Sequence, residues 1–284
     1  MPTSGRKARP DTMRLPTRSA FVTLLLLAAA AAPAAGQLLR YGGPVGETHA
    51  YTRTQTDRVT QTVNGSDQTM NLESHWRFST TVEEDGADAV TLSVVHDSIA
   101  ISGVPADSAT DFSALYGRPV TLVMGHRGDV REVRPPDGVA GIERLDLETT
   151  YRTFFPTLPS DPVRPGLAWA DTLVLDTSQN GLDIHVQRIN QYRVPDEATP
   201  DERVEVDYST TLSVQGKGRQ HGAEVSLTGT GNGQGSFRFD ATSGEYLGSE
   251  ETSDVRMDAF VSSGGQNLLI PIVHRRTETV ERLQ

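Results

Sequence analysis

The sequence predicts a mainly β protein: an antiparallel meander that forms half-barrels or a sandwich, with one helix near 139–155. Most of the chain after residue 36 alternates apolar and polar residues with a period of two, which is typical of half-buried antiparallel strands. The same region is rich in Thr, Val and Tyr, which favour strands. Turn signals such as Asn64-Gly65 and Asp85-Gly86 separate the alternating segments.

The alternation is clearest over 204–214, where apolar and aromatic residues occupy every second position from Val204 to Val214. Comparable segments elsewhere predict strands near 48–63, 67–83, 89–101, 118–124, 129–134, 169–177, 182–194, 203–215, 223–239, 245–262 and 267–282. Strands this long, joined by short turns, favour a meander that curls around one core.

The only long segment with helical spacing is 139–155. Its apolar residues recur at intervals of three and four, and the pattern ends at Pro156. The proline-rich segment 156–166 then predicts an extended connector between an N-terminal β half with the helix, 37–155, and a C-terminal β half, 167–284. The two halves have similar layouts of turns and acidic loops, which suggests two similar halves.

Residues 1–36 have the features of a signal peptide. An apolar run from Ala20 to Ala32 follows several basic residues and precedes small ones, and it is too short to span a membrane as a helix. Translation starts at Met1 or at Met13, the latter giving a signal of more ordinary length. We therefore expect an exported protein, periplasmic or extracellular, with no membrane span in the mature chain.

The predicted mature chain is strongly acidic. The whole sequence has 26 Lys+Arg and 37 Asp+Glu, and the signal segment contains five of the basic residues and one acidic residue, which leaves 21 − 36 = −15. A surface of this charge repels phosphate backbones, so we expect no nucleic-acid partner. The chain has no cysteine, which excludes disulfides, thiol nucleophiles and thiolate metal sites.

No motif indicates catalysis. The seven histidines lack the spacing of metal ligands, and there is no G-x-S-x-G elbow. The carboxylates either alternate outward along the predicted strands or crowd loops. We therefore expect no catalytic residue, no metal and no cofactor, and a protein that is not an enzyme.

Aromatic strand faces and a glycine-rich strand favour a cavity. The candidate ligand-binding residues, from three strands and the helix, are Trp76, Phe78, Tyr151, Phe154, Phe155, Tyr208, Leu212, Gly229, Gly231 and Gly233. Glycine at every second position leaves one strand face bare, where a helix, an aromatic ring or a ligand can approach closely. The aromatic residues would serve equally well as plain core, so both interpretations stay open.

Four segments resemble a family of exported bacterial β-rich proteins of unknown function. They are LVMGHRGDV at 122–130, FPTLP at 155–159, VRPGLAW at 163–169 and FDATSGEYL at 239–247. The resemblance implies an envelope location and antiparallel β architecture, and it carries neither catalytic residues nor a ligand. A curved sheet with one helix is also similar in architecture to periplasmic lipoprotein-carrier half-barrels.

Two functions follow as hypotheses. In the first, the exported protein binds a lipid-like or other apolar small molecule in a concave sheet, with 139–155 as a lid. In the second, it is an envelope scaffold or interaction module that presents a polar, acidic surface to an envelope protein.

Overall fold

The structure is a computed structural model, and it describes residues 36–103, 110–139, 146–179, 181–198, 203–220 and 222–284. Residues 1–35 of the predicted signal peptide and the segment 140–145 of the predicted helix lie outside the described residues.

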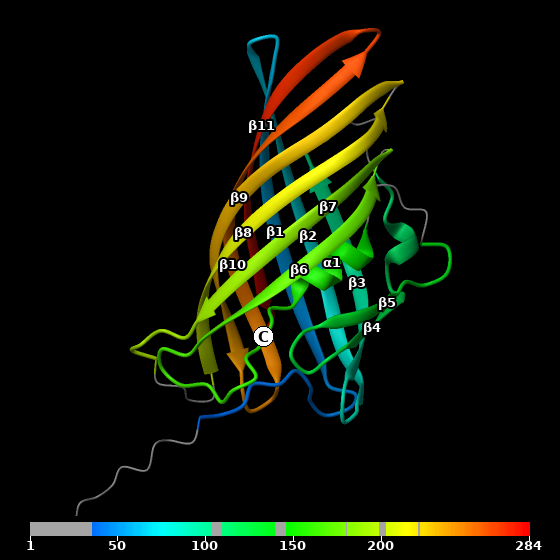
Figure 1. The fold of residues 1–284 in the computed structure, drawn as a ribbon. Helices are drawn as coiled ribbons and strands as arrows, with labels where there is room; N and C mark the ends of the chain where they lie inside the picture. Colours follow the sequence, from blue (N-terminus) through cyan, green and yellow to red (C-terminus); the bar gives the residue numbers. More distant parts are fainter. Residues whose placement is uncertain (1–35, 104–109, 140–145, 180, 199–202, 221) are drawn as a thin grey trace, which may run out of the picture. The chain divides into compact units, whose positions relative to one another are not determined.

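All eleven predicted strands are present, and they form one antiparallel sheet (Figure 1). They are β1 Thr48–Val63, β2 Ser66–Asp85, β3 Val90–Ser102, β4 Pro119–Met124, β5 Val130–Arg134, β6 Ala168–Gln179, β7 Leu182–Arg193, β8 Arg203–Gln220, β9 Ala223–Asp240, β10 Glu245–Ser263 and β11 Gln266–Arg282. Most ends agree with the prediction to within two residues, because turn residues with positive φ, such as Asn64 and Gly65, define them. The prediction of a mainly β fold is confirmed.

The strand order is β5-β4-β3-β2-β1-β11-β10-β9-β8-β7-β6. The first strand pairs with the last, from Tyr51 opposite Arg282 to Gln61 opposite Ile272, so the two predicted halves join in one sheet. Each half is itself a meander, and β5 and β6 are the two edges of the sheet. The predicted alternative of a sandwich is wrong, because no second sheet exists among the described strands.

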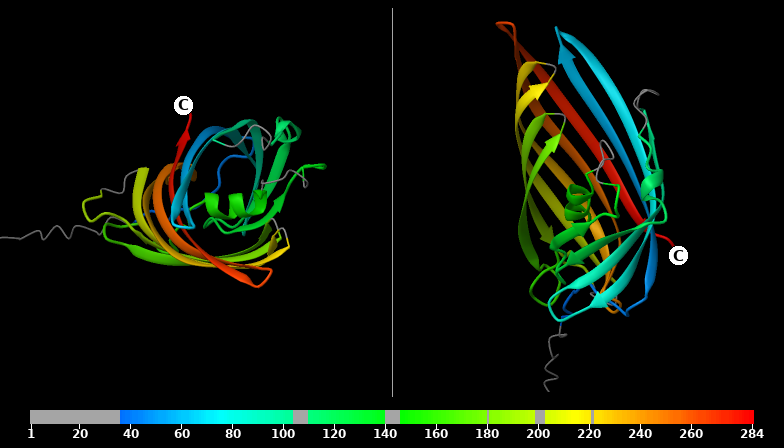
Figure 2. Two further views of the ribbon diagram at one scale, coloured as in Figure 1. Left: turned by 90° about the horizontal axis from the view of Figure 1, so that it is seen from above. Right: turned by 90° about the vertical axis from the view of Figure 1, so that its right-hand side faces the viewer.

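The sheet is strongly curved, and α1, Leu147–Phe154, lies on its concave side (Figure 2). The Asp146 carboxylate caps the helix by accepting from the Thr149 backbone N–H at 3.0 Å. It also accepts from the Thr177 hydroxyl of β6 at 3.1 Å, which ties the helix to the edge of the sheet. The helix ends before Pro156, as predicted. A short 3₁₀ turn, Ser113–Leu115, precedes β4.

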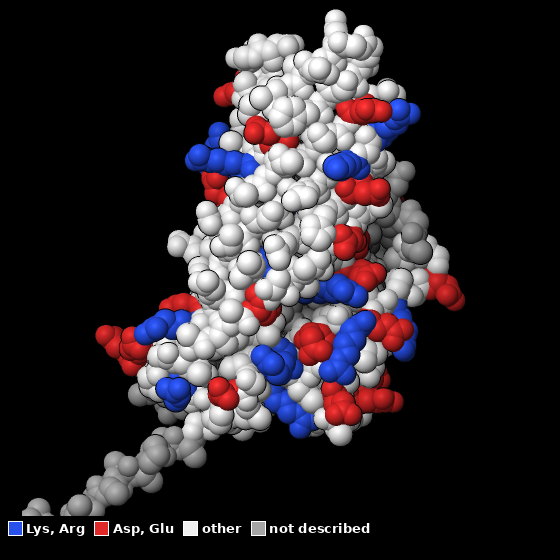
Figure 3. Space-filling model, in the orientation of Figure 1, with Lys and Arg blue, Asp and Glu red and all other residues white. Residues whose placement is uncertain are grey.

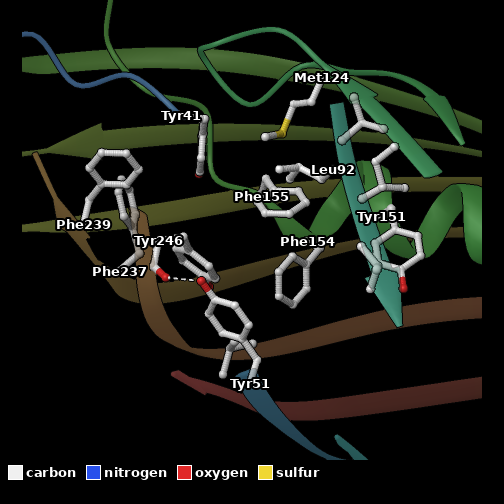
Figure 4. Close-up of a cluster of buried hydrophobic side chains, with 14 of the residues drawn as sticks. Tyr41, Tyr51, Leu92, Met124, Tyr151, Phe154, Phe155, Phe237, Phe239 and Tyr246 are labelled. Atoms are coloured by element: carbon white, nitrogen blue, oxygen red, sulfur yellow. Dashed lines mark hydrogen bonds between the residues drawn. The ribbon is translucent and has the colours of Figure 1, made fainter. Parts of the chain in front are cut away.

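An aromatic cluster fills the concave face at the end of the sheet that carries α1 (Figure 4). Phe154 packs edge-on against Phe78 at 5.5 Å and against Tyr246 at 5.6 Å between ring centroids. The Tyr51 hydroxyl donates to the Tyr246 carbonyl at 2.7 Å, so the buried phenol has a partner. The helix is therefore held by rings from both halves of the chain.

Candidate functional site

The concave face of the sheet changes character along its strands. We call its three zones the aromatic core, the polar band and the apolar trough. The aromatic core lies beside α1, the apolar trough lies toward the turns at 64–65 and 264–265, and the polar band lies between them.

Five of the candidate ligand-binding residues lie in the aromatic core. They are Trp76, Phe78, Tyr151, Phe154 and Phe155, and each is at most 9% exposed. Tyr151 spans the core from the helix to β3, where its hydroxyl lies 2.9 Å from Nε2 of His96. These rings pack against one another as core, and Phe154 and Phe155 also line a cavity beside the helix.

The apolar trough contains inward-facing apolar side chains that the rest of the protein leaves half-buried or exposed. Period-two alternation places them on the same face as the buried residues of each strand. They are Met70 and Leu72 of β2, Ile184 and Val186 of β7, Leu212 and Val214 of β8, Leu227 of β9, Met257 and Val261 of β10, and Ile270 and Ile272 of β11. No described part of the chain covers this zone as α1 covers the aromatic core.

The glycine-rich strand is β9, and Gly229, Gly231 and Gly233 all face the concave side. A Cβ added at Gly231 would lie 2.7 Å from a methyl group of Val255 on β10. The helix is not among the nearest neighbours of these glycines, so neighbouring strands, not α1, occupy the bare face. Beside the trough, at Gly235, the covering group is the Tyr208 ring, 2.7 Å from an added Cβ. Side chains of β10, Met257 and Val255, therefore fill the space over Gly229 and Gly231.

The convex face is polar along β8, but near the β10–β11 turn it exposes Phe260 (50%) and Leu269 (48%). On β8 the outward positions carry Glu205, Asp207, Ser209, Thr211 and Ser213. Charged side chains of both signs are interspersed over the view in Figure 3, and they are sparse at the end with the β10–β11 turn, where 259–273 contains no charged residue. Polar side chains therefore line the outer face of β8 behind the trough, whereas the outer face near the β10–β11 turn is itself partly apolar.

The polar band begins with a half-buried ion pair between two strands of the C-terminal half. Arg188 of β7 contacts Glu251 of β10 at 2.7 Å, and it also donates to Asn190 at 2.8 Å. The Tyr208 hydroxyl donates to the same Glu251 carboxylate at 2.9 Å. Burial raises the pKa of Tyr208, and the negative charge of Glu251 raises it further.

A second group of charges continues the polar band across the junction of β11 and β1. Arg53 contacts Glu278 at 2.7 Å. Asp57 accepts from His274 at 2.7 Å and from Arg276 at 2.9 Å. Burial alone would raise the pKa of Asp57, but these two partners hold it below its usual range. The inward carboxylates differ from the sequence-based expectation that strand carboxylates point outward.

Between the polar band and the C-terminal end of α1 lies a cavity of about 570 Å³. Its walls include Arg152 and Phe155 beside Asp171 of β6, Arg188 and Glu251. Asp171 accepts from the Thr157 hydroxyl at 2.5 Å through Oδ2, and its Oδ1 has no hydrogen-bond partner among the described residues. The cavity therefore combines apolar rings with several hydrogen-bonding groups, as ligand pockets do.

Tyr208 and Leu212 lie on one face of β8, as periodicity predicts, whereas Asp171, Arg188 and Glu251 were not among the predicted site residues. The signal was present in the sequence, because these charged residues occupy inward positions of the period-two pattern.

Across the part of the chain that the structure describes, no cluster of three or more His, Asp or Glu side chains is arranged to hold a metal ion. Within the same residues, no helix has the length and apolar character needed to cross a membrane.

Comparison with known proteins assigns no family to the chain. No family model matches it, and no curated protein matches it. Solved structures similar to it include Pseudomonas aeruginosa OccK8 (OprE), with 8% identity, a TM-score of 0.22, and coverage of 86% of this chain and 100% of that one. Acinetobacter baumannii OccAB4 has 9% identity, a TM-score of 0.22, and coverage of 84% and 99%. Likenesses this weak carry no argument about fold or function, so the concave face is the basis for the function proposed below.

Proposed function

We propose that the protein binds an amphipathic, lipid-like ligand on the concave face of its sheet, with the apolar part of the ligand in the apolar trough. The observation that carries the proposal is the set of inward apolar side chains left uncovered there. Leu212 and Val214 are only half-buried, and Met70 is 45% exposed. Large contiguous apolar surfaces are rare on soluble proteins and mark binding sites.

The size of the effect follows from the apolar area. Fully burying a chain of about twelve carbons would contribute roughly 9 kcal/mol at about 0.8 kcal/mol per CH₂. An open trough buries only part of the chain, and association itself costs several kcal/mol. We therefore expect a dissociation constant between about 1 μM and 1 mM for a single-chain ligand.

We propose further that the protein acts by binding rather than by catalysis, and that it is exported. The ion pairs of the polar band support the first point, since Arg188 and Glu251 already satisfy each other instead of presenting a free acid and base. The features of residues 1–36 support the second.

The test is a titration with an apolar fluorescent probe. Leu212→Glu places a charge in the trough and should weaken probe binding by at least roughly tenfold. Thr211→Glu is the matched control, because the adjacent residue is exposed on the convex face, and it should leave the affinity unchanged. If neither the parent protein nor the control binds the probe, the proposal fails and the alternative of an envelope scaffold or interaction module gains support.

A further inference from the structure

We propose that the ligand of the apolar trough carries more than one hydrocarbon chain, as a diacylated or more highly acylated lipid does, and that these chains lie side by side along the strands. This inference rests on the proposed function and specifies the class of lipid that the trough takes. The width of the trough, which the register of the strands defines, carries it.

The inward-facing residues of the trough form rows that run from strand to strand, because residues paired directly across an antiparallel ladder point to the same face. The first row crosses six strands, from β6 to β11, and consists of Leu175, Val186, Val214, Gly229, Met257 and Ile272. The second row, from β7 to β11, consists of Ile184, Gly216, Leu227, Ala259 and Ile270. The third row, nearest the turns, consists of Leu182, Gly218, Val225, Val261 and Leu268. None of these residues has a charged or polar side chain.

The trough is therefore broad. Neighbouring strands lie about 4.8 Å apart, so the six strands of the first row span roughly 24 Å along the curve of the sheet. Along β10, the distance from Val255 to Val261 is roughly 20 Å, because each strand residue adds about 3.3 Å. Hydrocarbon chains in van der Waals contact lie about 4–5 Å apart. A single chain that follows the strands therefore covers the width of about one strand and leaves most of each row in water.

The filled end of the same sheet shows how much material its curvature accommodates. There α1 and the aromatic core occupy the concave side, and a helix with its side chains is about 10–12 Å across. Closed barrels of about eight strands are filled by their own side chains, whereas larger ones leave room for a ligand. This sheet has eleven strands, and the trough side chains Val186, Val214 and Ile272 stay half-buried. About two or three hydrocarbon chains side by side have the girth of a helix, so they would fill the trough as α1 fills the other end.

The experiment compares two lipids that share a head group and differ by one chain. They are lauroyl lysophosphatidylcholine and its derivative with a hexanoyl chain on the free hydroxyl, each used below its micelle concentration to displace the bound apolar fluorescent probe. If half of the added chain is buried in the trough, the affinity should rise by at least roughly thirtyfold. At saturation, native mass spectrometry should detect more than one molecule of the single-chain lipid per protein.

A gain in affinity below about threefold, or saturation at one single-chain lipid per protein, would overturn the inference while the trough proposal stands. If neither lipid displaces the probe, the trough proposal itself is overturned.

Two substitutions at opposite sides of the second row test the width directly. Ile184 on β7 and Ile270 on β11 are separated by roughly 19 Å along the curve of the sheet. Ile184→Trp and Ile270→Trp each fill one side of the trough, so each should lower the gain from the second chain by at least roughly fivefold. The affinity for lauroyl lysophosphatidylcholine should stay within about threefold in both variants, because the other side remains open.

The matched controls are His185→Trp and Leu269→Trp, at the adjacent exposed positions on the convex face, and both should keep the full gain. If one of the two inward substitutions abolishes binding of the single-chain lipid while the other has no effect on either lipid, the trough holds one chain on one side, which contradicts the inference.

Discussion

Phe154→Ala separates a helix that is core from a helix that is a lid. The Phe154 ring is 7% exposed and has aromatic neighbours at 5.5 Å (Phe78), 4.8 Å (Phe155) and 5.6 Å (Tyr246). Removing a buried phenylalanine side chain costs about 3–5 kcal/mol, because the transfer free energy is lost and a cavity remains. The structure therefore predicts a fall of that size in the free energy of unfolding.

The assay is urea unfolding followed by far-UV circular dichroism, together with a probe titration at low urea. At about 2–4 °C per kcal/mol for a chain of this size, the midpoint of thermal unfolding should fall by roughly 6–20 °C. Probe affinity should stay within about twofold of the parent value, since the ring lies in the aromatic core and not in the trough.

Phe260→Ala is the matched control, because its ring is 50% exposed on β10. Its unfolding free energy should change by less than about 1 kcal/mol. If Phe154→Ala lowers the free energy of unfolding by less than about 1 kcal/mol but abolishes probe binding, the assignment of the helix to the core is refuted. That result would favour the lid predicted from the sequence.

Two further predictions concern buried polar groups. Arg188→Met leaves the half-buried Glu251 carboxylate with Tyr208 but without its cation, so the free energy of unfolding measured in urea should fall by about 1–3 kcal/mol. Combining Arg188→Met with Glu251→Gln should restore much of this loss. A fall below about 0.5 kcal/mol in the single variant would contradict the role of the pair. Burial lowers the pKa of His96 to about 4 from its ordinary 6.5. As the pH falls, the unfolded chain therefore takes up a proton on His96 before the folded protein does. The contribution of the neutral His96 to stability, fully present above about pH 6.5, should be lost as the pH falls toward 4. The fall in the free energy of unfolding should approach about 3 kcal/mol over this pH range. His96→Gln should flatten this part of the plot of unfolding free energy against pH. An unchanged plot in that variant would assign the acid sensitivity to other groups.

The strands were predictable because the information that defines them is local. β1 has the bounds that its alternation and the Asn64-Gly65 turn predict, 48–63. The pairing of β1 with β11 was not predictable, since it joins residues such as Tyr51 and Arg282 that are distant in sequence, and many β segments share one alternating pattern.

The site was only partly predictable for a related reason. Periodicity places Phe154 and Leu212 equally on apolar faces, but only the curvature of the sheet determines that one is covered and the other is not. Asp171 interrupts the apolar positions of β6, and its role depends on Thr157 and on the strands that face it. The C-terminal end of the helix at Pro156 was predictable, whereas its start at Leu147 is defined by the Asp146 cap, and 140–145 of the predicted helix lie outside the described residues.

The most direct test of the central claim is native mass spectrometry of the protein exported and purified without detergent, followed by organic extraction. The proposal predicts an adduct of near one-to-one stoichiometry whose extracted component is a lipid. The adduct should be lost in Leu212→Glu but not in Thr211→Glu. A mass spectrum without any adduct, together with an extract that contains no lipid and no binding of the apolar fluorescent probe, would contradict the claim that the trough is a ligand site.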